Sequence, residues 1–145
     1  MDIRLAIAAA MALTLLAVTT ATHHYALQAL GRASGRLRLS RHGVVGFLIA
    51  LIGVHLAQIA LYAMAYQVGV QLGLGHLRGS SGTAELDFFY FAAETYSTLG
   101  YGDIVPVGAL RLMASVEALN GLMLLAWSGS FVYGALERQD WRPPA

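Results

Sequence analysis

The chain has no cysteine and no lysine, and only 12% of its 145 residues are charged. The absence of cysteine excludes disulfides, iron–sulfur clusters and thiolate metal sites. The charged share is about half of that in a soluble domain, and the net charge of +1 offers no basic surface for nucleic acid. Apolar residues make up 57% of the chain, more than a soluble core of this size can hide. We therefore expect one domain whose solvent is lipid.

Three apolar segments are long enough to cross a bilayer as helices. The first runs from about residue 5 to 21, the second has its apolar centre at 44–66, and the third covers about 109–136. Each can span about 30 Å of hydrocarbon. The fold class predicted from these segments is an all-α membrane protein with three transmembrane helices.

The first segment has an alternative interpretation as a signal peptide, because Ala21 and Thr22 are small residues that imitate a cleavage site. Four arginines follow it, however, whereas a translocated sequence is poor in arginine, so we expect a retained helix. Basic loops stay in the cytoplasm, which places the N-terminus outside and the C-terminus in the cytoplasm. The same arginines are expected to touch anionic lipid headgroups: Arg32, Arg36, Arg38 and Arg41.

The connection between the second and third segments, residues 73–108, is unlike an ordinary loop. It opens with a flexible glycine-rich run and continues with an aromatic piece at 86–97, which is too short to span but suits a re-entrant helix. That helix must stop near Thr98, where two glycines surround Tyr101. Glycine permits backbone conformations that turn successive carbonyl oxygens toward one axis, where they can replace the water around a cation.

This segment resembles the pore domain of tetrameric potassium channels, especially the compact bacterial type. The matching run is FAAETYSTLGYGDIVP at residues 91–106, and the resemblance extends from about Gly43 to Leu136. It implies a pore domain at 43–137, with an outer helix at 43–72, a pore helix at 85–97, a filter at 98–102 and an inner helix at 109–136. Residues 1–42 would be an extra N-terminal helix with a basic cytoplasmic linker, and residues 138–145 a short cytoplasmic tail.

The resemblance implies a potassium-selective channel subunit rather than an enzyme, with potassium ions and no organic cofactor. One filter strand cannot surround an ion, so a homotetramer is expected. Leu99 stands where the family more often has valine, and its side chain is expected to pack behind the filter. Retention of Tyr101 favours potassium over sodium. The filter residues expected to bind potassium are Thr98, Leu99, Gly100 and Tyr101, with Gly102 completing the motif.

Two alternatives to this function stay open. Within the channel class, the pore could be a non-selective cation channel. From another class, the chain could be a non-conducting membrane scaffold or regulatory subunit that retains the pore fold. The compact chain suggests a prokaryotic inner membrane, on the resemblance alone.

The resemblance also assigns roles to residues around the filter. Glu94 and Asp103 match a carboxylate pair behind the filter of some family members, where two close carboxyls would share a proton. Gly121 is a candidate gating hinge, although ordinary helix packing is an equal interpretation. The register with the family predicts three residues facing the cavity: Met123, Ala126 and Ser130.

Polar residues inside the spans need partners. Glu117 is the only acid within an apolar span, and His55 and Gln58 lie at comparable depth and could bind it. A proton-sensing role for Glu117 or His55 is left open. The adjacent His23 and His24 are interpreted as residues of the membrane interface, not as a metal site, because neighbours on a helix point in different directions.

Overall fold

The computed structural model describes residues 2–36, 41–79 and 84–137. Its three long helices are α1 (Ile3–Arg36), α2 (Arg41–Gln71) and α4 (Leu110–Glu137). Each contains a stretch long and apolar enough to cross a membrane, and most side chains in these stretches are not buried within the chain. Apolar side chains facing outward are expected where the solvent is lipid. The predicted all-α membrane fold with three transmembrane helices is therefore confirmed.

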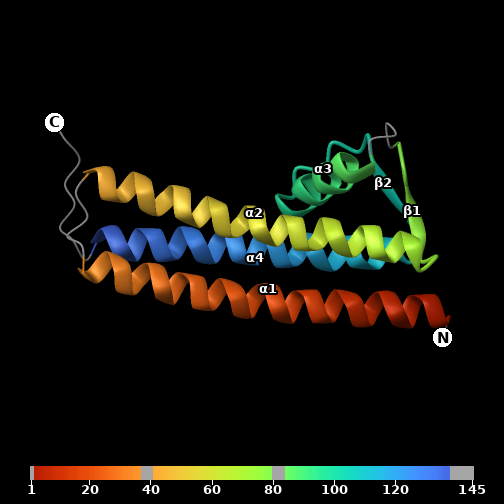
Figure 1. Cartoon of the computed structure of the whole chain (residues 1–145), viewed down its shortest axis with the longest axis horizontal. Helices are drawn as coiled ribbons and strands as arrows, with labels where there is room; N and C mark the ends of the chain where they lie inside the picture. Colours follow the sequence, from red (N-terminus) through yellow and green to blue (C-terminus); the bar gives the residue numbers. More distant parts are fainter. Residues whose placement is uncertain (1, 37–40, 80–83, 138–145) are drawn as a thin grey trace.

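The long helices run side by side, and in the view of Figure 1 α4 is drawn between α1 and α2. They alternate in direction, so the start of α1, the end of α2 and the start of α4 lie at one end of the bundle (Figure 1). α1 packs mainly on α4 and secondarily on α2. The connection between α2 and α4 therefore lies at the same end of the molecule as the beginning of α1.

The connection folds back along the bundle as a short helix and a pair of strands. Helix α3 (Ala84–Tyr96) packs on α2 and α4, and its first turn carries Glu85 and Asp87, whose charge suits the positive end of the helix dipole. Strand β1 (Gly75–Arg78) precedes α3 in the sequence and strand β2 (Val105–Gly108) follows it, and the two strands pair with each other in antiparallel fashion. The sequence predicts only a flexible run before α3, so the strand pair was not expected. It joins the segment before α3 to the segment that follows the predicted filter loop.

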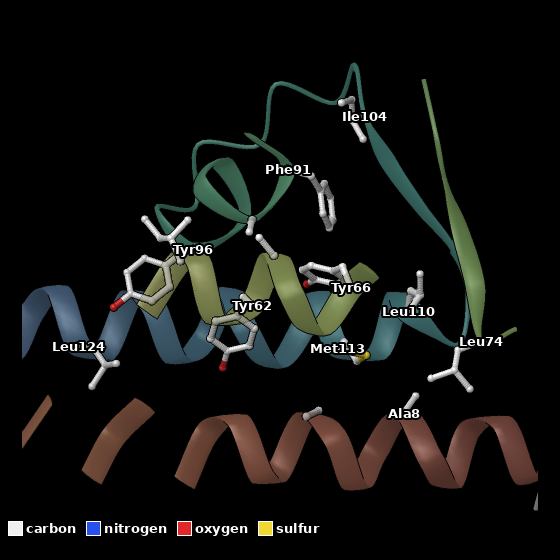
Figure 2. Close-up of a cluster of buried hydrophobic side chains, with 14 residues drawn as sticks. Ala8, Tyr62, Tyr66, Leu74, Phe91, Tyr96, Ile104, Leu110, Met113 and Leu124 are labelled. Carbon is white, nitrogen blue, oxygen red and sulfur yellow. The ribbon is translucent and has the colours of Figure 1, made fainter. Parts of the chain in front are cut away.

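A cluster of buried aromatic and apolar side chains fixes α3 against the long helices (Figure 2). Tyr62 and Tyr66 of α2 face Phe91 and Tyr96 of α3, and all four are at most 4% exposed. The rings of Tyr66 and Phe91 meet edge to face with centroids 4.9 Å apart. Met113 closes the cluster from α4. The core thus holds the helix that precedes the predicted filter loop.

Most element boundaries agree with the predicted ones. The outer, pore and inner helices begin and end within two residues of the predicted ranges. The first helix is longer than predicted, because it does not stop near Ala21 but continues to Arg36. No proline or charged residue interrupts residues 22–31, so nothing ends the helix there. Arg38 and the predicted tail at 138–145 lie outside the described residues.

Candidate functional site

The loop after α3 alternates in backbone handedness. Thr98, Gly100 and Gly102 have φ angles of 60°, 55° and 82°, while Leu99 and Tyr101 between them have no positive φ. A left-handed conformation is free for glycine but costs another residue about 1–2 kcal/mol. Thr98 is the only non-glycine residue with positive φ in the described ranges. Strain of this kind persists where the surrounding structure imposes it, commonly at functional sites.

Hydrogen bonds from the loop to α3 set the direction of its first carbonyls. The N–H groups of Leu99 and Gly100 both donate to the carbonyl oxygen of Glu94, at 2.9 and 3.2 Å. A trans peptide holds its N–H and the preceding C=O on opposite sides. The carbonyl groups of Thr98 and Leu99 therefore both point away from α3. Carbonyl oxygens turned to one side are ligands that can replace the hydration shell of a cation.

The side chains of the loop are open on one face. Leu99 is 58% exposed and Tyr101 is 69% exposed in the single chain. The Leu99 side chain was expected to pack behind the filter, but within one chain most of its surface has no neighbour. Large apolar side chains left open beside ordered backbone call for a covering surface.

The two carboxyl groups beside the loop are held differently. Glu94 is 4% exposed, and its Oε1 has no hydrogen-bond partner in the described part of the chain. Asp103 is exposed, and its Oδ2 accepts a hydrogen bond from the Tyr90 hydroxyl at 3.1 Å. Burial and this bond to Asp103 raise the pKa of Tyr90 to about 12, so the phenol stays protonated as a donor. No described hydrogen bond joins Glu94 to Asp103 directly, and their sharing of a proton stays a prediction.

Gly121 lies where α4 crosses the end of α3. A methyl group built on Gly121 would overlap the carbonyl oxygen of Tyr96. The residue therefore has a packing role that needs no hinge, and its role in gating stays a prediction. The predicted cavity-lining side chains lie on a part of α4 that this chain leaves exposed: Met123, Ala126 and Ser130.

The partner of the intramembrane acid differs from the expected one. Glu117 is completely buried, and its Oε2 accepts a hydrogen bond from the hydroxyl of Tyr66 on α2. His55 and Gln58, which were expected to lie near it, bind other groups. Tyr66 lies about three helical turns from His55 along α2, so it faces a different depth of α4. The assignment of His55 and Gln58 as partners of Glu117 is therefore wrong.

A polar cluster at the middle of the bundle was missed by the sequence analysis. His23 is completely buried and contacts Ser128 of α4 and Gln58 of α2, so its assignment to the membrane interface is wrong. The reason is that α1 continues past it for three further turns. His24 is exposed but lies at the same depth as His23, with its ring 5.8 Å from that of Trp127 on α4, so its assignment to the interface is wrong for the same reason. The rarity of polar side chains in a span is the pattern that could have indicated this cluster.

Side chains offer no conventional metal centre in the described ranges, because no group of three or more His, Asp or Glu residues gathers to hold an ion. Backbone carbonyl groups are a second kind of cation ligand, and the loop after α3 presents them. A short helix that ends in a loop with carbonyl groups turned to one side, set between two spanning helices, defines the pore segment of a cation channel.

Comparison with known proteins agrees with this class. Residues 49–138, more than half of the chain, match a family described as ion channel. The chain belongs to this ion-channel family, and the resemblance to potassium-channel pore domains seen in the sequence is confirmed.

Three curated relatives are potassium channels by name. The inward rectifier potassium channel Kirbac3.1 of Paramagnetospirillum magnetotacticum is 33% identical over 93 residues, which cover 63% of this chain and 30% of the relative. The voltage-gated potassium channel Kch of Escherichia coli (strain K12) is 45% identical over 51 residues, 34% of this chain and 12% of the relative. The two pore potassium channel b of Oryza sativa subsp. japonica is 30% identical over 80 residues, 54% and 22% respectively. The chain thus spans less than a third of the length of each relative.

Proposed function

We propose that the chain is one subunit of a homotetrameric, potassium-selective channel. The observation that carries the proposal is the loop backbone, in which left-handed residues alternate and two N–H groups bind back to Glu94. In a tetramer the carbonyl oxygens of Thr98 to Tyr101 would stack as rings around one axis, with Gly102 at the outer end. Such rings coordinate a cation without the trapping strength of carboxylates.

The exposed face of the loop supports assembly from several copies. Leu99 and Tyr101 are apolar or aromatic, mostly exposed, and adjacent to the carbonyl groups proposed to bind the ion. Neighbouring copies would cover these side chains and close the ring. Retention of Tyr101 and the names of the relatives support potassium over sodium.

The proposed channel function also implies a membrane and an orientation in it. We propose a prokaryotic inner membrane, with the start of α1 outside and the end of α4 in the cytoplasm. Arg32 is exposed near the end of α1, where it can meet anionic headgroups together with the neighbouring arginines of the sequence. Opening by a bend at Gly121, a cavity lined by Met123, Ala126 and Ser130, and filter support from Glu94 and Asp103 belong to this proposal.

The test is ion flux into liposomes that contain the purified protein, with potassium and sodium gradients compared. We expect potassium flux at least about tenfold above sodium flux, because carbonyl rings discriminate between the two ions. Tyr101→Asp should abolish or equalise the fluxes, whereas Tyr101→Phe keeps the ring and should retain more selectivity. Equal potassium and sodium fluxes in the wild type would make it a non-selective channel. No flux across a range of pH and voltage would favour the scaffold.

A further inference from the structure

Five buried polar side chains from all four helices meet in the middle of the bundle, at the level where α3 ends. Each is at most 8% exposed. They come from α1, α2, α3 and α4, and each forms hydrogen bonds with two others. We call them the polar ring: Tyr96, Gln58, His23, Ser128 and His55.

The contacts close into a circle. The Tyr96 hydroxyl lies 2.6 Å from Gln58 Oε1, and Gln58 Nε2 lies 3.3 Å from His23 Nδ1. His23 Nε2 lies 3.1 Å from Ser128 Oγ. The circle returns through Ser128 Oγ to His55 Nε2 at 2.9 Å and through His55 Nδ1 to the Tyr96 hydroxyl at 2.9 Å.

The chemistry of Gln58 fixes the direction of every bond in the circle. Its Nε2 also donates to the backbone carbonyl of Thr19 at 3.1 Å, and a carbonyl only accepts, so the amide cannot be turned around. Gln58 Oε1 is therefore an acceptor, and Tyr96 must give it its single proton. The Tyr96 oxygen can then only accept from His55, which makes His55 Nδ1 a donor.

The remaining bonds follow by the same count. A neutral His55 that donates at Nδ1 accepts at Nε2, so Ser128 donates its proton there. The Ser128 oxygen then accepts from His23 Nε2, and His23 Nδ1 accepts from Gln58. All five members donate in one sense around the circle. The arrangement requires both histidines to be neutral and in opposite tautomers: the Nδ1–H form at His55 and the Nε2–H form at His23.

The ring reaches the filter through Tyr96. Tyr96 is the last residue of α3, two positions before the left-handed Thr98, and its backbone lies against Gly121 of α4. A shift of the Tyr96 side chain would move the end of the helix whose Glu94 carbonyl binds the loop. His23 brings α1 into this support, whereas the described backbone hydrogen bonds of the loop run to α3 alone.

We propose, building on the channel function proposed above, that the polar ring is a positioning device for the ion filter, through which α1 holds the end of the pore helix. The residues of the ring touch no permeating ion and act through Tyr96. A fully satisfied ring is rigid inside a membrane, because an unpaired polar group there has no water to bind.

Protonation of either histidine would break the one-way sense of the ring. A proton on His23 Nδ1 would face the Gln58 amino group, and a proton on His55 Nε2 would face the Ser128 hydroxyl. The two imidazole centroids are 5.1 Å apart, so two charges would also repel. Support is therefore complete at neutral and alkaline pH and is lost as the pH falls.

No carboxylate offsets such a charge in the described part of the chain. The buried or nearby titratable groups on the packed elements include His24 on α1, Tyr62 and Tyr66 on α2, Glu94 on α3 and Glu117 on α4. His24 is exposed, Tyr62 accepts from Asn120, and Glu117 is bound by Tyr66. None of the described hydrogen bonds joins these groups to either ring histidine.

The tautomers can be read without any ion flux. We expect ¹⁵N spectra of histidine-labelled protein in bilayers at pH 7.5 to show a neutral Nδ1–H ring for His55 and a neutral Nε2–H ring for His23, assigned with His23→Phe and His55→Phe. The exposed His24 is the internal reference for a histidine outside the ring. The same tautomer at both positions, or a charged ring at either, would overturn the proposal.

The positioning role is tested by variants that open the ring with little change in volume. Tyr96→Phe removes the link to α3, and Ser128→Ala opens the ring between the histidines. We expect either to lower the ratio of potassium to sodium flux by about fivefold, the equivalent of one buried hydrogen bond. The matched control is Ser115→Ala, an exposed serine on the same helix, which should behave as wild type.

The pH profile separates positioning from general stability. Wild-type potassium flux should fall by about fivefold or more between pH 7.5 and about 3 as the ring opens, while Ser128→Ala should start low and change less. If wild type conducts and both ring variants keep its selectivity and pH profile, the positioning role is wrong and the channel function stands. If wild type does not conduct, the channel function fails, and the tautomers still decide whether the ring exists. Should Tyr96→Phe not fold, Ser128→Ala carries the same comparison.

Discussion

Gly121 is a residue at which α4 lies directly against the backbone at the end of α3. Its Cα hydrogen faces the backbone of Tyr96, so the two helices approach without a side chain between them. Small residues at such crossings are common where membrane helices pack. Gly53 of α2 provides a contrast, because a methyl group added there would meet no atom within 4 Å.

Replacing Gly121 with Ala should destabilise the protein by about 1–3 kcal/mol, because the methyl group overlaps backbone that cannot rotate away. Thermal unfolding in detergent measures the effect. Gly53→Ala is the control and should be neutral or slightly stabilising, since alanine favours a helix over glycine by about 1 kcal/mol. Equal unfolding temperatures for the two variants would contradict the packing role and would favour the alternative role of Gly121 as a gating hinge.

At the scale of elements, the sequence predicts the helices well and their facing sides poorly. The spans and the turn at Thr98 follow from long apolar runs and from the glycines around Tyr101, which are local features. The side that a helix turns toward its neighbours can be predicted from sequence only when an apolar stripe lies opposite a polar one. A helix surrounded by lipid is apolar on all sides and carries no such pattern. That is why His23 was placed at the interface and Glu117 was given the wrong partner. The pairing of β1 with β2 was invisible because it joins residues about thirty positions apart.

The filter illustrates both sides of this limit. The positive φ angles of its two glycines agree with the permissive backbone that the sequence predicts, while binding of an ion by its carbonyl groups stays a prediction. The left-handed Thr98 and the two bonds to the Glu94 carbonyl could not be predicted, because they depend on where α3 ends in three dimensions. The roles of Glu94, Asp103 and Gly121 in gating stay predictions.

Tyr66 with Glu117 is one of three buried polar pairs described between α2 and α4, beside His55 with Ser128 and Tyr62 with Asn120. Tyr66→Phe should destabilise the protein by about 1–3 kcal/mol, because a buried carboxyl group loses its only described partner. The double variant Tyr66→Phe with Glu117→Leu should recover much of that loss, since removing both polar partners leaves nothing unsatisfied. Denaturation of the purified protein measures both. A double variant less stable than Tyr66→Phe alone would show that Glu117 has another partner.

At the scale of the whole molecule, the direction of α1 makes a prediction about sides of the membrane. α1 begins at the end of the bundle that carries β1 and β2, and α4 finishes at the other (Figure 1). With the arginine-rich linker in the cytoplasm, an N-terminal tag should be cleaved by protease added to intact spheroplasts. A C-terminal tag should be cleaved only after permeabilisation, and it serves as the control. Protection of the N-terminal tag would invert the topology.

The open face of the loop, with Leu99 and Tyr101 exposed, has a genetic consequence. If four chains complete one pore, each chain holds a quarter of the ion's ligands, and a single defective copy spoils three sound ones. With equal amounts of normal and defective chains mixing at random, only about one assembly in sixteen would contain four normal chains. When it is co-expressed with the normal gene, an allele whose chain assembles but cannot conduct would therefore behave as dominant, whereas an allele that prevents folding would behave as recessive.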